Sequence, residues 1–359
     1  MINWWHNKFG EDELSRIISS YKNKNISQGL ITELFEKAVS DYLGIKYTIA
    51  VSSGSTALLL ALMSINIRHG DEVIIPNRTW IATAHAIHLL GAKVVTVDVQ
   101  SEIPIMEVKN IEKAITPKTK AIIPVHLNGR AVNMVAIRKI AKKYNIKVIE
   151  DSAQAIGSKN KTGYLGTQSD LGCFSLSVAK TISSGQGGFI VTNNKKLADK
   201  IRAMRTHGLE NVKDPSNWIM PGFNFRYTDL LASIAIEQLK QINQRIEHLK
   251  KLYKFYDEEL NNTPFVKIPV DIDKGEVPVY IEYLVPSNRN KWISYLFESG
   301  VETRPFYPDI DNASYLKYNA NNNINSKVFS KKGIYLPSGP HQSLENAAKC
   351  VKLIKEKLF

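Results

Sequence analysis

Residues 47–63 read YTIAVSSGSTALLLALM, and this stretch decides the fold. Its first five residues form a short apolar run rich in β-branched side chains, which is typical of a buried strand. The polar turn at residues 52–56 (SSGST) follows, and Ala57–Met63 then continues as an apolar helix. A strand that leads through a glycine-containing turn into a helix predicts the first part of a βαβ unit.

The same alternation of strands and helices continues to about residue 205. We expect further strands at Glu72–Ile75, Lys93–Val97, Lys120–Val125, Lys147–Glu150 and Gly188–Thr192, with helices at Thr79–Leu90, 108–115 and 132–144 between them. Such alternation predicts a largely parallel sheet covered by helices. Binding sites in sheets of this kind form beyond the carboxyl ends of the strands.

The pattern changes after residue 205. A long helix is expected over Leu230–Leu260, and a new unit of strands and helices begins near residue 262. Its expected elements are strands at Val277–Val285 and Val301–Phe306, helices at Arg289–Ser299 and from Leu344, and an exposed asparagine-rich loop at Tyr318–Asn325. We therefore predict an α/β protein with a large domain at residues 1–245, including an N-terminal arm, and a smaller α+β domain at residues 246–359.

The composition excludes several classes of protein. The 359 residues are 43% hydrophobic and 23% charged, which is ordinary for a globular protein. No apolar run approaches the roughly 18 residues that a bilayer span needs, so membrane insertion is not expected. No apolar secretory signal opens the chain either, and Cys173 and Cys350 are the only cysteines. A cytoplasmic protein without disulfides is the natural interpretation.

The formal net charge of +13 raises the question of an anionic partner. The lysines are spread along the chain without a run of five or six basic residues, and no nucleic-acid motif stands out. We therefore expect no nucleic-acid partner; an anionic small substrate or a general surface bias explains the charge equally well. His85 and His88 lie three apart without a third ligand, so no metal site is expected.

Two polar segments follow expected strands, and each has a chemical and a structural interpretation. The turn that contains Gly54, Ser55 and Thr56 offers backbone N–H groups and hydroxyls that could cradle a phosphate, or it simply caps the helix. Asp151 closes an apolar strand and could hold a protonated ring nitrogen, or it caps a helix. Gln154 follows three residues later in the same short turn.

A lysine and a tryptophan also lie beside strand ends. Lys180 follows the segment FSLSVA at residues 174–179 and precedes the glycine-rich residues 185–188. Partial burial would lower the pKa of this lysine and free its lone pair to attack a carbonyl, whereas most lysines are solvated surface residues. Trp80 could stack on a flat heteroaromatic ring or pack in the core.

Together these segments resemble the DegT/StrS family of pyridoxal 5'-phosphate (PLP)-dependent sugar aminotransferases. The matching segments, in family order, are 53–58 (SGSTAL), 70–76 (GDEVIIP), 79–84 (TWIATA), 124–126 (PVH), 150–155 (EDSAQA), 174–180 (FSLSVAK), 205–208 (RTHG) and 222–226 (GFNFR). Each is weak alone, but eight in order are specific and span nearly the whole chain. The 29-residue step from Asp151 to Lys180 also fits the family.

The resemblance implies the fold of type I PLP enzymes, with a large, mostly parallel sheet domain and a smaller C-terminal domain. It also implies residue roles. Lys180 would carry PLP as a Schiff base and shuttle the proton, Asp151 would keep the pyridine nitrogen protonated, Trp80 would stack on the ring, and Gln154 would bond near the 3-hydroxyl. Ser55, Thr56 and Ser175 would hold the phosphate, with Gly54 permitting close approach, and Asn224 would reach the cofactor of the neighbouring subunit in a homodimer with shared active sites.

The sequence departs from the family pattern at three places. Gln186 stands where the family often has glutamate, and Leu176 stands where phenylalanine is frequent; neither residue is assigned chemistry. Residues 128–130 are Asn-Gly-Arg where Tyr-Gly-Gln is usual. Arg130 would pair with an anionic substrate group if it faces the pocket, and otherwise it is an exposed loop residue. His126 and Arg226 are further candidate substrate contacts.

The implied reaction moves an amino group, from L-glutamate as in the family, to a keto-sugar that is nucleotide-linked, with pyridoxamine phosphate as the intermediate. The product would be an amino-deoxysugar for a surface polysaccharide such as an O-antigen, or for a secondary metabolite. Some relatives are dehydratases with histidine in place of the lysine, and Lys180 argues against that reaction. Amination of a cyclitol or free sugar acid, a lyase step, and a non-catalytic binding or regulatory protein are the alternatives. The sugar, the nucleotide, the aminated carbon and its stereochemistry stay open.

Overall fold

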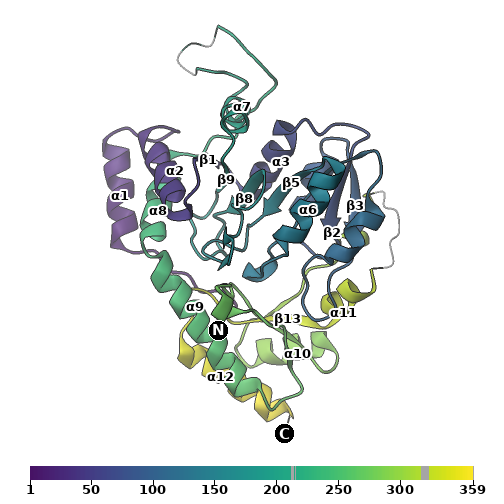
Figure 1. The fold of residues 1–359 in the computed structure, drawn as a ribbon. Coiled ribbons are helices and arrows are strands. Elements are labelled where there is room, and N and C mark those ends of the chain that lie inside the picture. Colours follow the sequence, from purple (N-terminus) through teal and green to yellow (C-terminus); the bar gives the residue numbers. More distant parts are fainter. Residues whose placement is uncertain (212–213, 215, 317–322, 359) are drawn as a thin grey trace.

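The computed structural model describes residues 1–211, 214, 216–316 and 323–358, and two β-sheets organise it (Figure 1). The large sheet runs in the order β1-β9-β8-β5-β4-β2-β3. Its strands are β1 Tyr47–Val51, β2 Glu72–Pro76, β3 Lys93–Val97, β4 Thr119–Ile122, β5 Lys147–Asp151, β8 Leu171–Ser175 and β9 Gly188–Thr192. The strands are parallel except β9, which pairs antiparallel with both β1 and β8.

This arrangement brings the carboxyl ends of all six parallel strands to one edge of the sheet. The amino end of β9 joins them, because Gly188 pairs with both Val51 and Ser175. The predicted α/β fold with a mostly parallel sheet is confirmed. Strand β8 had not been expected from the sequence, although its residue Ser175 had been named there as an expected phosphate contact.

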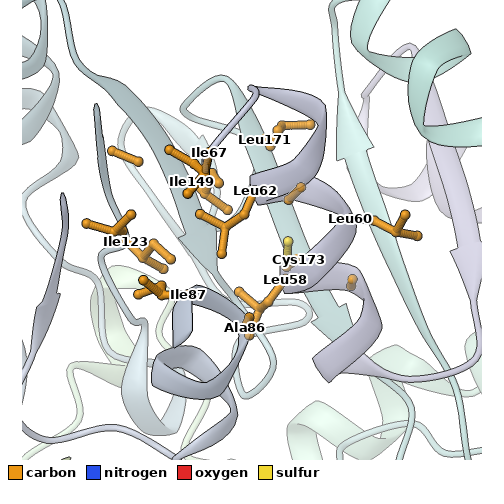
Figure 2. Close-up of a cluster of buried hydrophobic side chains, with 14 of the residues drawn as sticks. Leu58, Leu60, Leu62, Ile67, Ala86, Ile87, Ile123, Ile149, Leu171 and Cys173 are labelled. Atoms are coloured by element: carbon orange, nitrogen blue, oxygen red, sulfur yellow. The ribbon is translucent and has the colours of Figure 1, made fainter. Parts of the chain in front are cut away.

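Helices cover both faces of the large sheet because its central strands are apolar on both sides. Ile149 of β5 packs with α3 (Gly54–Ser64), α4 (Ala82–His88) and α7 (Lys195–Arg205), whereas the adjacent Val148 packs with α6 (Met134–Tyr144) on the opposite face. Figure 2 shows Leu58 and Leu62 of α3 on the side of the helix that faces Ile149 and Cys173. The short α5 (Ile111–Ala114) and the hairpin β6 (Lys159–Asn160) with β7 (Gly163–Tyr164) complete this unit.

The residues expected to be an N-terminal arm form two helices. Helices α1 (Glu11–Lys22) and α2 (Leu30–Leu43) both pack against α8 (Asp229–Lys240). The buried Asp229 joins α8 to the start of α2, because its carboxylate accepts hydrogen bonds from the backbone N–H groups of Gly29 and Thr32, both at 2.9 Å. These bonds satisfy free donors at the start of α2.

The small sheet has the order β10-β11-β13-β12 and is antiparallel throughout. Its elements are β10 Val266–Lys267, β11 Ile281–Leu284, β12 Arg304–Pro305, β13 Gly333–Leu336, α10 Arg289–Glu298, α11 Ile324–Lys332 and α12 Leu344–Leu358. The N-terminus lies beside this unit (Figure 1): Ile2 pairs with Val301, and Trp5 pairs with Ser338. The smaller unit therefore includes the first residues of the chain.

One helix connects the two units. The expected helix over residues 230–260 is interrupted at Gln241, after which α9 (Ile242–Leu260) begins. Ile246 and Leu249 of α9 belong to the core under β9, and Leu252 and Tyr256 belong to the core of the small unit. The boundary expected between residues 245 and 246 falls inside this helix.

The asparagine-rich segment had been predicted to be an exposed loop over Tyr318–Asn325. Residues 318–322 lie outside the described part of the chain. Asn323, by contrast, is buried, and Ile324 begins α11, so the prediction is wrong for the end of the segment. Within the described ranges, no helix combines the length and the apolar character that crossing a bilayer requires.

Candidate active site

A cavity of about 620 Å³ opens at the edge of the large sheet where its parallel strands end. Residues from the large unit, the small unit and the N-terminal segment line it. From the large unit these include Gly54, Ser55, Trp80, Thr83, Asp151, Gln154, Ser175 and Lys180, and from the other two they are Trp4, Tyr280, Arg304, Pro305, Tyr307 and Tyr335. The structure thus brings together seven of the residues singled out in the sequence.

Asp151 forms the floor of the cavity at the end of β5. Its side chain is buried, Oδ2 accepts a hydrogen bond from Thr83 Oγ1 at 2.8 Å, and Oδ1 accepts one from the backbone N–H of Ala153 at 3.1 Å. Burial raises the pKa of this carboxyl, while the two hydrogen bonds and the nearby Lys180 oppose that rise. The carboxylate is therefore fixed in orientation and gains from a cationic partner.

Lys180 faces Asp151 across the cavity from the loop that follows β8. Burial lowers the pKa of its amine to about 8, against the attraction of Asp151, which raises it. Tyr280 anchors the loop, because its hydroxyl donates to the carbonyl of Ala179 at 2.8 Å. In the described part of the chain the Lys180 amine has no hydrogen bond or ion pair, so the side chain remains available for chemistry.

The amino end of α3 forms a third part of the cavity. The expected phosphate cradle is open here at Ser55, which is exposed, and at Ser175 on β8. A Cβ on Gly54 would lie 2.9 Å from the Cβ of Ser175, so glycine is needed for α3 to begin this close to β8. The free N–H groups of the helix start therefore face the cavity beside two hydroxyls, which suits a phosphate.

Thr56 has a structural task in the same turn. Its Oγ1 accepts from the backbone N–H of Ser53 at 2.9 Å, and Ser53 Oγ accepts from the backbone N–H of Thr56 at 3.1 Å. This reciprocal pair is a helix capping box. Thr56 does not line the cavity. Thr56 therefore caps the helix, and the phosphate contact expected for it stays a prediction.

Trp80 and Gln154 border the space above Asp151. The indole of Trp80 is 57% exposed and meets the ring of Tyr307 edge-on at 5.6 Å, so core packing does not explain this residue. Gln154 Oε1 accepts from the backbone N–H of Asn128 at 2.9 Å, which fixes its amide at the cavity wall. An exposed aromatic face beside a fixed amide suits a flat, polar-edged ring.

Comparison with known proteins agrees with this geometry. The sequence pattern of the DegT/DnrJ/EryC1/StrS aminotransferase family matches residues 7–355. The chain belongs to this family. GDP-perosamine synthase of Escherichia coli O157:H7 is 35% identical over 338 residues, covering 92% of this chain and 91% of the synthase. GDP-perosamine synthase of Caulobacter vibrioides is 36% identical over 289 residues, covering 76% of each chain.

A solved structure extends the likeness to the fold. The crystal structure of a DegT DnrJ EryC1 StrS aminotransferase from Brucella abortus superposes with a TM-score of 0.91 at 26% identity, covering 97% of this chain and 95% of that one. The chain is therefore a PLP-dependent sugar aminotransferase with the expected fold.

The cavity of this aminotransferase fits PLP. A buried carboxylate stands where a protonated pyridine nitrogen needs a partner, and a lysine of lowered pKa lies close enough to interact with it. The start of α3 with Ser55 and Ser175 offers a phosphate cradle, and Trp80 offers an aromatic face. Among the described residues no group of His, Cys, Asp and Glu side chains gathers as metal ligands.

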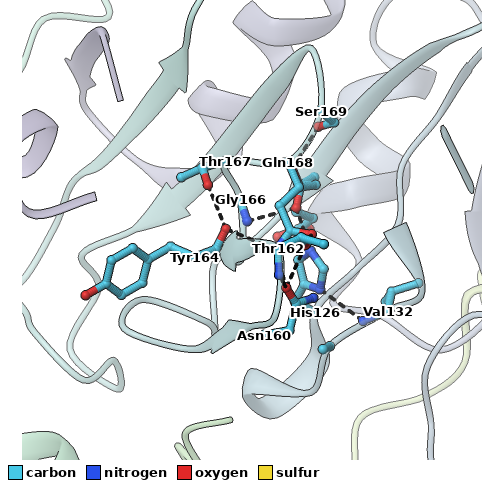
Figure 3. Close-up of polar contacts among 12 residues, drawn as sticks. His126, Val132, Asn160, Thr162, Tyr164, Gly166, Thr167, Gln168 and Ser169 are labelled. Carbon is cyan, nitrogen blue, oxygen red and sulfur yellow. Dashed lines mark hydrogen bonds and ion pairs between the residues drawn. The ribbon is translucent and has the colours of Figure 1, made fainter. Parts of the chain in front are cut away.

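The structure does not bring His126 to the cavity. Nδ1 of its buried ring accepts a hydrogen bond from the backbone N–H of Val132 at 3.3 Å. Nε2 therefore carries the proton and donates a hydrogen bond to Glu150 at 2.9 Å. Glu150 also accepts hydrogen bonds from the backbone N–H groups of Gly166 and Gln168 and from the hydroxyl of Ser169. Figure 3 shows His126 with Val132, Gly166 and Gln168 around it. His126 therefore holds Glu150, the neighbour of Asp151 on β5, and the substrate contact expected for His126 stays a prediction.

Arg130 fits neither of its two predicted roles. It is 1% exposed rather than an exposed loop residue, and it does not line the cavity. Its Nη1 donates to Glu282 Oε2 at 2.6 Å, and Nε and Nη2 donate to the carbonyls of Pro269 and Ile268. Because these three partners belong to the small unit, Arg130 links the two units instead of binding substrate.

Asn224 and Arg226 do not line the cavity of their own chain, although Arg226 pairs with Val51 at the end of β1. Asn224 is exposed, and its Oδ1 accepts from Arg226 Nε at 2.9 Å. The contact that the family resemblance implies for Asn224, with a neighbouring subunit's cofactor, stays a prediction. Arg226 is engaged with Asn224 and not with the cavity.

Several lining residues were not singled out from the sequence. Thr83 lies inside the matched segment 79–84, which is the signal that could have found it. Its hydroxyl lies 3.0 Å from that of Thr79, which precedes α4. Trp4, Tyr280 and Arg304 had no such signal. They reach the cavity through pairing between distant segments, such as that of Trp5 with Ser338.

Proposed function

We propose that this aminotransferase transfers an amino group from L-glutamate to a nucleotide-linked keto-sugar, specifically a GDP-linked one. The observation that carries the proposal is the pairing of Lys180, whose pKa is lowered, with the buried Asp151 in one cavity. The GDP-perosamine synthases at 35% and 36% identity support the GDP-sugar class. The product then serves a surface polysaccharide, and the enzyme acts in the cytoplasm.

Each residue of the cavity has a separate role in the proposed reaction. PLP, when bound, supplies an electron sink for the carbon that gains or loses the amino group. Asp151 holds a proton at the ring nitrogen, and Thr83 keeps the carboxylate oriented through its 2.8 Å hydrogen bond. Lys180 Nζ moves a proton to and from the reacting carbon, which a pKa near neutral favours. Trp80 and Tyr307 confine the ring and exclude water.

We also propose a homodimer in which two chains complete each site. Asn224 is exposed, and Phe223 beside it is 68% exposed although it is a large apolar residue. Trp218 in the same region is 71% exposed. Apolar side chains concentrated around one polar candidate residue suit a protein interface. A dimer by light scattering, with loss of cofactor affinity in Asn224→Ala, is the expected result, and a fully active monomer would refute it.

The function is tested by following its two halves separately. The purified protein is loaded with PLP, mixed with glutamate, and assayed for 2-oxoglutarate; then a GDP-linked 4-keto-sugar, a free keto-sugar and a keto-cyclitol are compared as acceptors. We expect amination of the GDP-linked sugar and no turnover by Lys180→Ala, while the exposed Lys196→Ala remains active. Failure with every sugar ketone, or preference for the cyclitol, would contradict the sugar-nucleotide assignment.

A further inference from the structure

The rim of the cavity carries a second cation. Among the cavity-lining residues in the described ranges, only Lys180 and Arg304 are basic. Arg304 belongs to β12, where it pairs with Tyr335 of β13, so both side chains project from the same face of the small sheet. Its side chain is 54% exposed, whereas Lys180 lies deeper. The cavity therefore has one cation near its floor and one at its mouth.

Two neighbours hold the Arg304 side chain in place. Its Nη2 donates to Glu302 Oε1, and its guanidinium carbon lies 5.9 Å from the ring centroid of Trp4. Glu302 is fixed in turn, because its Oε2 accepts the backbone N–H of Trp4 at 3.2 Å. A pre-positioned arginine loses less conformational entropy when it binds an anion.

The same contacts leave most of the guanidinium free. Within the described part of the chain, Nη2 is the only Arg304 nitrogen that makes a hydrogen bond. Nε and Nη1 keep their hydrogens for a ligand, and a guanidinium fork matches phosphate oxygens well. Glu302 therefore orients Arg304 without using up its donors.

We propose that Arg304 binds the diphosphate that links sugar and nucleotide in the acceptor, an inference that rests on the proposed function. The start of α3 and its hydroxyls suit the phosphate of PLP, and Lys180 is needed at the reacting carbon. Arg304 is the remaining basic group that lines the cavity from the described residues. A sugar near Lys180 then extends its diphosphate toward the mouth, where Arg304 lies. Arg130, which the sequence had suggested for an anionic substrate, is closed off by Glu282.

The test separates the acceptor from the donor. Arg304→Gln and Arg304→Lys are compared with Arg138→Gln, which changes an exposed arginine on α6 far from the lining residues. Each half-reaction is measured in single turnovers, and GDP binding is measured by calorimetry. We expect Arg304→Gln to weaken the GDP-linked sugar and GDP by about tenfold or more, since charge-assisted hydrogen bonds are lost. The rate with glutamate should change less than about twofold, and Arg304→Lys should recover part of the affinity.

Three outcomes would overturn the inference. They are unchanged affinity for the GDP-sugar and GDP in Arg304→Gln, an equal effect in Arg138→Gln, and a selective loss with glutamate, which would assign Arg304 to the donor carboxylate. These outcomes are distinct from failure of the proposed function, in which the unmodified enzyme itself aminates no GDP-linked sugar. Visible absorbance of the PLP-loaded variant verifies that the cavity floor is intact in each case.

Discussion

Two pairs of opposite charges in this molecule, Arg130 with Glu282 and Lys180 with Asp151, differ in how far the protein itself satisfies them. Arg130 and Glu282 lie 2.6 Å apart, both are 1% exposed, and backbone carbonyls take up further guanidinium donors. Asp151 and Lys180 interact electrostatically, yet no ion pair joins them within the described residues, and both line the cavity. The Arg130–Glu282 pair is closed, because the protein itself occupies its hydrogen-bonding groups. The Asp151–Lys180 pair is open, because both side chains remain accessible to a ligand in the cavity.

The difference between the two pairs shows what distinguishes a charged residue that stabilises the fold from one that takes part in chemistry. A buried charge whose hydrogen-bonding capacity is filled by its own protein has nothing left to offer a ligand. A charge that is partly desolvated but unsaturated has a shifted pKa and still needs a partner. Lys180, whose pKa is lowered to about 8, meets the second description. The chemistry of this fold therefore lies in the open pair.

Breaking the closed pair should have the largest effect on stability. Arg130→Met leaves the Glu282 carboxylate buried without its cation, and we expect a loss of about 3–5 kcal/mol in the free energy of unfolding. Denaturant unfolding measures this loss. Activity per folded molecule should remain, because Arg130 does not line the cavity.

The double variant Arg130→Met/Glu282→Leu is the matched control for that experiment. Because it removes both charges, it should be more stable than Arg130→Met alone. A double variant that is less stable than the single one would show that the linkage rests on the carbonyl contacts of Arg130 instead of on the ion pair.

Neutralising one member of the open pair should affect chemistry more than stability. Asp151→Asn preserves the shape of the side chain and removes its charge, so the ring nitrogen loses the group that holds its proton. We expect turnover to fall on the order of 100-fold, the size typical of losing one preorganised electrostatic contact. Steady-state rates and thermal unfolding are measured together. If the loss of turnover in Asp151→Asn were matched by an equal loss of folded protein, the role of Asp151 would be structural.

The open pair should also respond to pH. With its pKa lowered from 10.5 to about 8, about half of the Lys180 amine is free base at pH 8, against about one part in 300 for an unshifted lysine. The initial rate of visible-absorbing complex formation between the PLP-free protein and pyridoxal should therefore rise from pH 7 and level off above about pH 9. Lys180→Ala provides the background rate.

The sign of the coupling can be checked in the same assay. The negative charge of Asp151 raises the pKa of Lys180, so Asp151→Asn should move the midpoint to lower pH. A midpoint that stays the same, or moves upward, would show that the two groups are not coupled across the cavity.

The sequence was sufficient for most of the large sheet and for the two charged residues Asp151 and Lys180 that line the cavity. Strands β1, β3 and β9 have the bounds expected from the sequence, and Asp151 was found at the end of an expected strand. Lys180 was found from the buried-looking segment before it and from the family resemblance. Local patterns carry this information, since a buried strand needs a continuous apolar run. The N-terminal helices were missed because their role depends on the distant Asp229.

The position of Arg304 at the cavity mouth and the contact of Arg130 between the two units also depend on distant residues, so they could not be predicted. Arg304 lines the cavity because β12 pairs with β13, and Arg130 is buried because Glu282 meets it from 152 residues away. Neither partner leaves a trace in the local sequence. A turn such as SGST poses a subtler difficulty, because a phosphate cradle and a helix cap require the same residue types.

Substitutions at Thr56 and Ser175 distinguish a helix cap from a phosphate cradle, and we expect them to have the smallest effects on stability and cofactor affinity. Thr56→Val removes one half of the capping box, so we expect a loss of about 1 kcal/mol in stability and nearly unchanged affinity for PLP. Ser175→Ala, at a residue that lines the cavity, should instead weaken PLP by about tenfold at little cost in stability. Equilibrium dialysis and thermal unfolding measure both. If Thr56→Val weakened PLP as much as Ser175→Ala does, the Thr56 hydroxyl would be part of the cradle, as the family resemblance had implied.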